Sequence, residues 1–184
     1  MEEVYCGVLC PLRVKDGGRL EALLTRRNFT KPDGGMMTYP GEWVFPGGTM
    51  DSGDRDRKAT AIREFREELN YAGPIEEPFL MREVDHSDNG LLYRMQFFGV
   101  YGVTSRGLSI PLNSSGEVIS FAWLTPLGAQ RIMGAPWFTN DQLKEFNSRG
   151  LPLTERQFPQ QQYLTLNYLI ANQETLAPFD IKAR

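Results

Sequence analysis

A glycine turn followed directly by an acidic helix is the feature that most constrains this chain. Residues 47–71 read GGTMDSGDRDRKATAIREFREELNY, and at about 100° per residue the part from 57 to 71 winds into an amphipathic helix. Its apolar stripe holds three side chains, Ile62, Phe65 and Leu69. Three carboxylates share a second face, Glu64, Glu67 and Glu68. One face is therefore expected to pack on the fold while the other reaches into a site.

The spacing of the three glutamates needs a physical explanation. Like charges three and four positions apart destabilise a helix by about 0.2–0.5 kcal/mol per pair. A hard divalent cation would compensate, because magnesium takes a few carboxylate oxygens together with substrate phosphates. The alternative for a lone E-x-x-E-E pattern is a solvated acidic face. The glycine turn before the helix favours the first interpretation, a metal held against a diphosphate.

Two neighbouring motifs resemble the signature of a known protein family. Residues 45–48 read FPGG and residues 63–68 read REFREE, which together resemble the signature of the Nudix hydrolases. The sequence departs from that signature in three ways. Asp54 replaces the usual glutamate, one extra residue separates it from Arg63, and Asn70 stands where glycine is usual. Asn70 is the mildest change, because asparagine tolerates the left-handed conformation of a helix C-cap.

The altered spacing resembles the coenzyme A diphosphatase-like branch of that family. This branch pairs FPGG with an acidic loop and a T-A-x-R-E run, as residues 45–64 do here, and the LLTRR segment at 23–27 also resembles it. Gly41 keeps the branch's spacing to FPGG. Asn28 and Met37, however, replace a usual small residue and a usual arginine. On the matching segments, coenzyme A or an acyl derivative is the first choice of substrate, although these two positions depart from the branch.

The resemblance implies a set of site residues. Glu64, Glu67 and Glu68 would ligate Mg²⁺ or Mn²⁺, helped by the Gly48 backbone carbonyl, and the identity of the general base stays open. Arg63 would orient a glutamate through a bidentate pair. Glu117, six residues before Trp123, is a candidate fourth carboxylate or else a surface loop acid. Three further residues are expected to bind substrate: Arg26, Arg27 and Phe45.

Length and charge limit the remaining functional classes. The 184 residues, 41% of them hydrophobic, suit a single domain over 1–184. A net charge of -3 gives no basic field, so the expected partner is a small nucleotide-type substrate and not a long nucleic acid. No apolar run approaches the about 18 residues of a membrane span, and the acidic amino terminus favours a cytoplasmic protein. A homodimer is left open.

Cysteine and histidine usage excludes other metal chemistry. Cys6 and Cys10 are the only cysteines and lie four residues apart in an apolar run, which predicts buried thiols in place of a disulfide or zinc pair. His86 is the only histidine, so a multi-histidine metal site is excluded. Its neighbours in residues 85–90, DHSDNG, are typical of a turn.

The resemblance, together with the order of the expected elements, implies an α/β/α sandwich with a mixed, partly antiparallel sheet. Strands are expected in five segments: 3–14 and 19–26 as a hairpin, 75–84, 91–103 as a strand buried on both faces, and 117–126. Helices are expected at 127–132, 141–146 and 158–172, on the face opposite the acidic helix. Residues 28–40 form a loop outside the core that is a candidate substrate loop. The last helix is expected to pack on the domain.

The reaction implied by the resemblance is hydrolysis of a diphosphate in a nucleoside diphosphate derivative, with water attacking phosphorus. Other substrates on the same scaffold are ADP-ribose, dinucleoside polyphosphates, nucleotide sugars and nucleoside triphosphates. A second class is a binding module of the same fold without turnover. An acidic amphipathic helix in an unrelated fold is the third alternative.

Overall fold

The computed structural model describes residues 2–31, 34–88, 90–110, 116–133, 143–144, 147–148 and 159–177. Within these ranges seven strands are found: β1 (Glu2–Lys15), β2 (Arg19–Arg27), β3 (Trp43–Val44), β4 (Gly47–Thr49), β5 (Phe79–Asp88), β6 (Leu91–Val100) and β7 (Val118–Leu124). The helices are α1 (Arg57–Leu69), the 3₁₀ turn η1 (Ser105–Gly107), α2 (Pro126–Met133), α4 (Gln160–Ala171) and α5 (Gln173–Leu176).

The sheet is mixed, as the sequence predicts. Its strands follow the order β3-β2-β1-β6-β5, while β4 pairs with β1 and β7 pairs with β2. Only the β1–β6 pairing is parallel among these strands. The predicted hairpin joins β1 to β2, and its turn uses Gly17 and Gly18 at positive φ, which glycine adopts without a side-chain clash.

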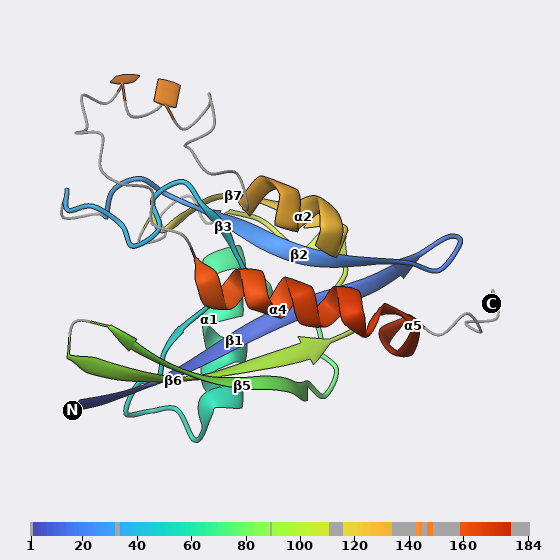
Figure 1. Cartoon of the computed structure of the whole chain (residues 1–184), viewed down its shortest axis with the longest axis horizontal. Helices are drawn as coiled ribbons and strands as arrows, with labels where there is room; N and C mark the ends of the chain where they lie inside the picture. The colour runs from blue at the N-terminus through green and yellow to red at the C-terminus, as the bar shows by residue number, and fades with distance from the viewer. Residues whose placement is uncertain are drawn as a thin grey trace.

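Helices cover both faces of the sheet, so the predicted α/β/α layering is confirmed (Figure 1). In Figure 1 the helix α1 lies behind β1, and α4 crosses in front of it. Phe65 and Leu69 of α1 are buried against Leu9 and Phe98. On the other face the core holds residues from β1, β2, α2 and α4: Cys10, Leu12, Leu24, Met133, Leu166 and Leu169. Each such large apolar side chain contributes about 1.5–3 kcal/mol on burial.

The acidic helix begins at Arg57, as predicted, and ends at Leu69, two residues before the predicted end at residue 71. The Asp56 carboxylate accepts a 2.8 Å hydrogen bond from the Ala59 N–H as an N-cap, and Asn70 is a left-handed C-cap with φ 46°. Gly7 of β1 lets α1 approach closely, since a Cβ there would lie 1.9 Å from the Arg57 carbonyl oxygen. The close approach buries Ala61 against the sheet and leaves Ile62 half-buried, so the apolar stripe is shifted from the predicted one.

The predicted turn around His86 is wrong. Strand β5 continues to Asp88, which pairs with Leu91, and His86 itself pairs with Tyr93. Gly90, immediately before β6, has φ 80°. Strand β6 is buried throughout only from Phe97 to Val100, while its first six residues are half-buried, so the prediction of burial on both faces fails over that part.

The loop over residues 28–40 is not wholly outside the core. Phe29 is 0% exposed and Met37 is 2% exposed, so both apolar side chains are buried although the residues around them are largely polar. Cys6 and Cys10 are buried free thiols, as predicted. The predicted helix at 141–146 lies almost entirely outside the described residues. Within the described part of the chain, none of the helices combines the length and apolar character needed to cross a bilayer.

Candidate active site

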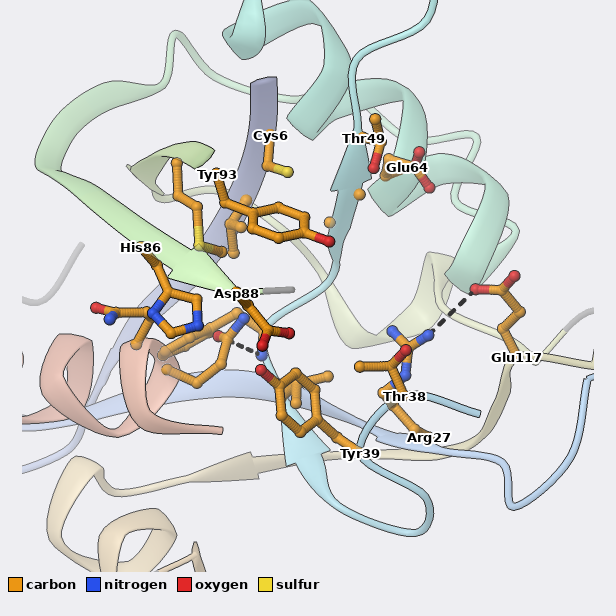
Figure 2. A pocket seen from close by; sticks show the side chains of 18 residues that line it. Cys6, Arg27, Thr38, Tyr39, Thr49, Glu64, His86, Asp88, Tyr93 and Glu117 are labelled. Carbon is orange, nitrogen blue, oxygen red and sulfur yellow. Dashed lines mark hydrogen bonds and ion pairs between the residues drawn. The ribbon is translucent and has the colours of Figure 1, made fainter. Parts of the chain in front are cut away.

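A pocket of about 470 Å³ lies between the glycine strand β4, the start of α4 and the strands β1 and β6 (Figure 2). This volume is within the range of roughly 300–1,000 Å³ that ligand sites occupy. Five of the residues predicted for the site line it: Arg27, Phe45, Gly48, Glu64 and Glu117. Figure 2 shows Glu64 and Glu117 on one side of the pocket and His86 on the other.

The acidic side of the pocket brings Glu117, from the segment before β7, next to Glu64 and Glu68 of α1. Burial raises the pKa of Glu64, and the charges of Glu67 and Glu117 add to that rise against the opposing effect of Arg63. Burial also raises the pKa of Glu68 to about 8; Arg27 opposes this rise, and the charges of Glu64 and Glu117 reinforce it. Glu68 lies next to the pocket, near the Gly47 N–H.

Glu68 has an unusual buried atom. Its Oε2 is enclosed and has no hydrogen-bond partner among the described residues. A buried oxygen without a partner costs about 1–3 kcal/mol, and more when the group is charged. Such an atom beside two other carboxylates is where a cation would be most strongly attracted.

Arg63 ties the acidic loop to the helix. Its Nε donates to Asp54 Oδ1 at 3.1 Å and its Nη2 donates to Asp54 Oδ2 at 2.9 Å. Its Nη1 contacts Glu64 Oε1 at 2.9 Å and Glu67 Oε2 at 3.1 Å, and Nη2 also donates to the Thr49 carbonyl at 3.1 Å. The two-nitrogen contact is therefore with Asp54, and each glutamate receives a single contact.

Asp54 is the residue that gives this arginine its fixed position. Its side chain is 7% exposed and also accepts hydrogen bonds from the Thr60 hydroxyl and the Asp51 N–H. The hydrogen bond from Arg63 holds the pKa of Asp54 well below its usual range. The aspartate that replaces the family's usual glutamate thus closes the loop onto α1 while Arg63 reaches the carboxylates.

The two adjacent arginines of β2 have different surroundings. Arg27 lines the pocket, with Nη2 3.5 Å from Glu117 Oε2 and an Nε that has no hydrogen-bond partner among the described residues. Arg26 donates from Nε to the Gly41 carbonyl at 3.3 Å and lies over the Phe29 ring, away from the pocket. Neighbouring strand residues point to opposite faces, so only one of the pair can face the site.

Glu67 and Phe45 complete the predicted set. Glu67 is exposed, pairs with Arg63 and lies outside the pocket, on the outer side of α1. Phe45 is 1% exposed and belongs to the core, while one side of it lines the pocket. Its contribution is apolar packing at the pocket wall, and its backbone N–H donates to Gln162 Oε1 at 3.1 Å.

The chemistry of the acidic side fits a hard divalent cation. Among the described residues, no three histidine, cysteine or acidic side chains already surround one common point. The fit rests on the donor set instead: oxygen ligands from Glu64, Glu68 and Glu117, one of them buried and unpartnered, with the Gly48 backbone beside Glu64. Magnesium and manganese prefer such oxygen ligands.

The opposite side of the pocket contains residues that sequence reasoning missed. Tyr39, His86 and Tyr93 line it, and Gln161 and Gln162 reach it from the first turn of α4. The glutamine run at 160–162 directly after a proline was the available signal, because polar amides at the buried start of an otherwise apolar helix need partners. His86 and Tyr93 become neighbours only through the β5–β6 register.

The fold, with its acidic end of the pocket, is that of a hydrolase of the pyrophosphatase type. The chain belongs to the Nudix family, because the family model described as the NUDIX domain matches residues 6–149.

Solved structures support the same fold. A Nudix hydrolase from Alicyclobacillus acidocaldarius aligns with a TM-score of 0.59 at 17% identity, covering 94% of this chain and 93% of that chain. The NUDIX domain of Shewanella oneidensis NrtR, complexed with ADP ribose, aligns with a TM-score of 0.55 at 16% identity over 82% of this chain and 88% of its own. A C. elegans Ap4A hydrolase aligns with a TM-score of 0.53 at 19% identity over 79% and 96%.

Proposed function

We propose that this chain catalyses the hydrolysis of a diphosphate linkage in a nucleoside diphosphate derivative, with Mg²⁺ or Mn²⁺ as cofactor. The observation that carries the proposal is the unpartnered, buried Oε2 of Glu68 next to Glu64 and Glu117. A folded chain accepts that electrostatic cost when a ligand relieves it.

Four groups would hold the metal: the carboxylates of Glu64, Glu68 and Glu117 and the backbone carbonyl of Gly48. A bound divalent ion would neutralise phosphate charge and lower the pKa of a water nucleophile. Glu67 faces outward and keeps Arg63 in place in this arrangement, although the family resemblance names it as a ligand.

The remaining charged residues position groups around that centre. Arg63 fixes the Glu64 carboxylate through Nη1 at 2.9 Å while Asp54 holds the guanidinium. Arg27 is a cation on the pocket wall, and its Nε, unpartnered among the described residues, supports a role in binding a phosphate oxygen. Phe45 and Val8 form apolar wall next to these groups, which excludes water from part of the site.

Coenzyme A remains the first substrate to test, because residues 45–64 follow the branch pattern. Two positions depart from that branch, and both have structural roles here. Asn28, in place of the usual small residue, donates to the Gly116 carbonyl, and Met37, in place of the usual arginine, is buried at 2% exposure and offers no cationic contact. ADP-ribose and dinucleoside polyphosphates therefore stand beside coenzyme A, in keeping with the ligands named for two of the similar structures.

The experiment is kcat/KM on coenzyme A, ADP-ribose, diadenosine polyphosphates, NADH and nucleoside triphosphates, with Mg²⁺ and with Mn²⁺. Chromatographic product analysis locates the bond that is cleaved, and coenzyme A should give a phosphopantetheine and adenosine 3′,5′-bisphosphate. A tenfold preference for another substrate would reject coenzyme A and keep the hydrolase. No turnover on the whole panel would favour a binding module.

The variant that tests the metal-ligand assignment is Glu68→Gln, which keeps the shape of the side chain and removes its charge. Turnover should fall by at least about a hundredfold with the fold retained, since a metal ligand is lost. Metal binding followed by isothermal titration calorimetry should weaken in the same variant. Unchanged turnover at saturating Mg²⁺ would refute the assignment.

A further inference from the structure

The first turn of α4 brings an unsatisfied amide to the pocket. Gln161 lines the pocket, and its Oε1 is buried without a hydrogen-bond partner among the described residues. Buried acceptors are normally paired, so an open one in a cavity indicates a missing donor. In Figure 2 the start of α4 lies on the side of His86, across the pocket from Glu64 and Glu117.

The neighbouring glutamine explains why Gln161 is held in place. Gln162 is 9% exposed, and its Oε1 accepts the Phe45 N–H at 3.1 Å, which joins α4 to the segment before β4. The Gln161 backbone carbonyl accepts the Thr165 hydroxyl at 2.9 Å. The helix start is thereby fixed against the pocket wall, and the Gln161 amide is presented from a rigid element, as specific recognition requires.

Flat aromatic surfaces lie in the same cavity. His86 and Tyr93 face each other across β5 and β6, with ring centroids 6.4 Å apart at 31°. Tyr39 also lines the cavity and has φ 56°, a conformation that non-glycine residues rarely adopt. Rings of this kind stack on nucleobases of any sequence, whereas an amide discriminates between their edges.

We propose that Gln161 is a specificity-determining residue that binds the adenine base of the substrate. Its Oε1 accepts a hydrogen bond from the exocyclic amino group, and its Nε2 donates to the adjacent ring nitrogen. Adenine fits because it presents a donor beside an acceptor, which a glutamine amide pairs at both points. The proposal rests on the proposed function, since it places the diphosphate at the Glu64 end and the base at the α4 end of one pocket.

The test is equilibrium binding of three probes to the full chain by titration calorimetry with Mg²⁺ present: adenosine monophosphate, purine riboside 5′-monophosphate and ribose 5-phosphate. The purine riboside lacks only the exocyclic amino group. Adenosine monophosphate should bind roughly tenfold more tightly than purine riboside monophosphate, because the analogue leaves the buried acceptor unpaired. Ribose 5-phosphate, without a base to stack, should bind more weakly still.

Two variants assign the difference to one side chain. Gln161→Leu should abolish the preference for adenosine monophosphate over purine riboside monophosphate, while Gln160→Leu, exposed on the same helix, should retain it. Equal binding of the first two probes to the wild-type chain would overturn the proposal, and that comparison does not depend on how the leucine variant folds. A retained preference in a chain that hydrolyses no diphosphate would leave Gln161's role standing and reject the proposed function.

Discussion

Replacing Gly48 by alanine would move one carboxylate and little else. A Cβ at Gly48 would lie 2.5 Å from Glu64 Oε1 and 2.6 Å from its Cδ. Ordinary contact begins near 3.4 Å, so the carboxylate must withdraw by about 0.9 Å. The obstacle is the far end of a flexible side chain, and Gly48 is not at positive φ, so the backbone should accept the change.

The size of the effect follows from that displacement. A misplacement of about 1 Å in a reacting group can cost on the order of a hundredfold in rate. Gly48→Ala should therefore reduce kcat by roughly that factor, with KM little changed if the shift affects a metal ligand and not substrate binding. The midpoint of thermal unfolding should stay within about 4 °C of the wild type, because no backbone contact is broken.

Two other glycines of the same segment serve as controls. Gly53→Ala meets nothing within 4 Å and should retain full activity. Gly47→Ala would place its Cβ 2.5 Å from the Gly7 carbonyl oxygen and 2.7 Å from Val8 Cα, so it should destabilise the β1–β4 pairing itself. Steady-state kinetics and thermal unfolding of the three variants separate these outcomes. Wild-type kcat in Gly48→Ala would refute the view that Glu64 acts from its present position.

Three further predictions concern charge and burial. Glu68→Gln should raise thermal stability of the metal-free protein at neutral pH and cancel the stabilisation gained on adding Mg²⁺, because it removes a buried, unpartnered carboxylate oxygen; a lower midpoint without metal would contradict this. Arg63→Lys should lower kcat by about 10–100-fold, as for residues that orient ligands. Arg63 lowers the pKa of Asp54 in the folded state, so the ionised carboxylate stabilises the fold at pH values above its ordinary pKa. That stabilisation is lost as the pH falls through the lowered pKa of the folded state. Arg63→Lys should weaken it, so the wild type should stay folded to a lower pH than the variant, as followed by fluorescence. Cys6 and Cys10 should resist alkylation in the native state, because burial raises the pKa of both thiols; rapid modification without unfolding would disprove it.

Local sequence was enough to predict the acidic helix and its start, but the predicted end at residue 71 lies beyond the C-cap at Asn70. Asp56 caps the start of α1 through its carboxylate, and Asn70 caps its end in the left-handed conformation. The residues of the family signature also lie within one continuous segment. The apolar stripe was less predictable, because Ala61 is buried where α1 meets Gly7 of β1 and Ile62 is only half-buried. Capping depends on a few adjacent residues, whereas packing depends on what the fold brings opposite.

The residues on the pocket side opposite Glu64 and Glu117 could not be predicted from local sequence. His86 looked like part of a turn because DHSDNG is polar, but pairing with β6 extends the strand through it. Gln161 lies far along the chain from the glycine strand; Gln162 accepts the Phe45 N–H, whereas Gln161 Oε1 has no partner among the described residues. Which of these two adjacent glutamines pairs with Phe45 depends on a contact between distant parts of the chain, which local sequence does not show.

The same reasoning applies to the acidic residues themselves. The sequence shows how many glutamates α1 carries, but it does not show which of them has an oxygen without a partner in the folded chain. In the folded chain Arg63 pairs with Glu64 and Glu67, and Arg27 pairs with Glu117. Glu68 is left with a buried oxygen that no described residue satisfies. Neutralising the exposed Glu67 should therefore affect metal affinity less than neutralising Glu68, and calorimetric Mg²⁺ affinities of Glu67→Gln and Glu68→Gln that fall equally would show that exposure does not distinguish the two roles.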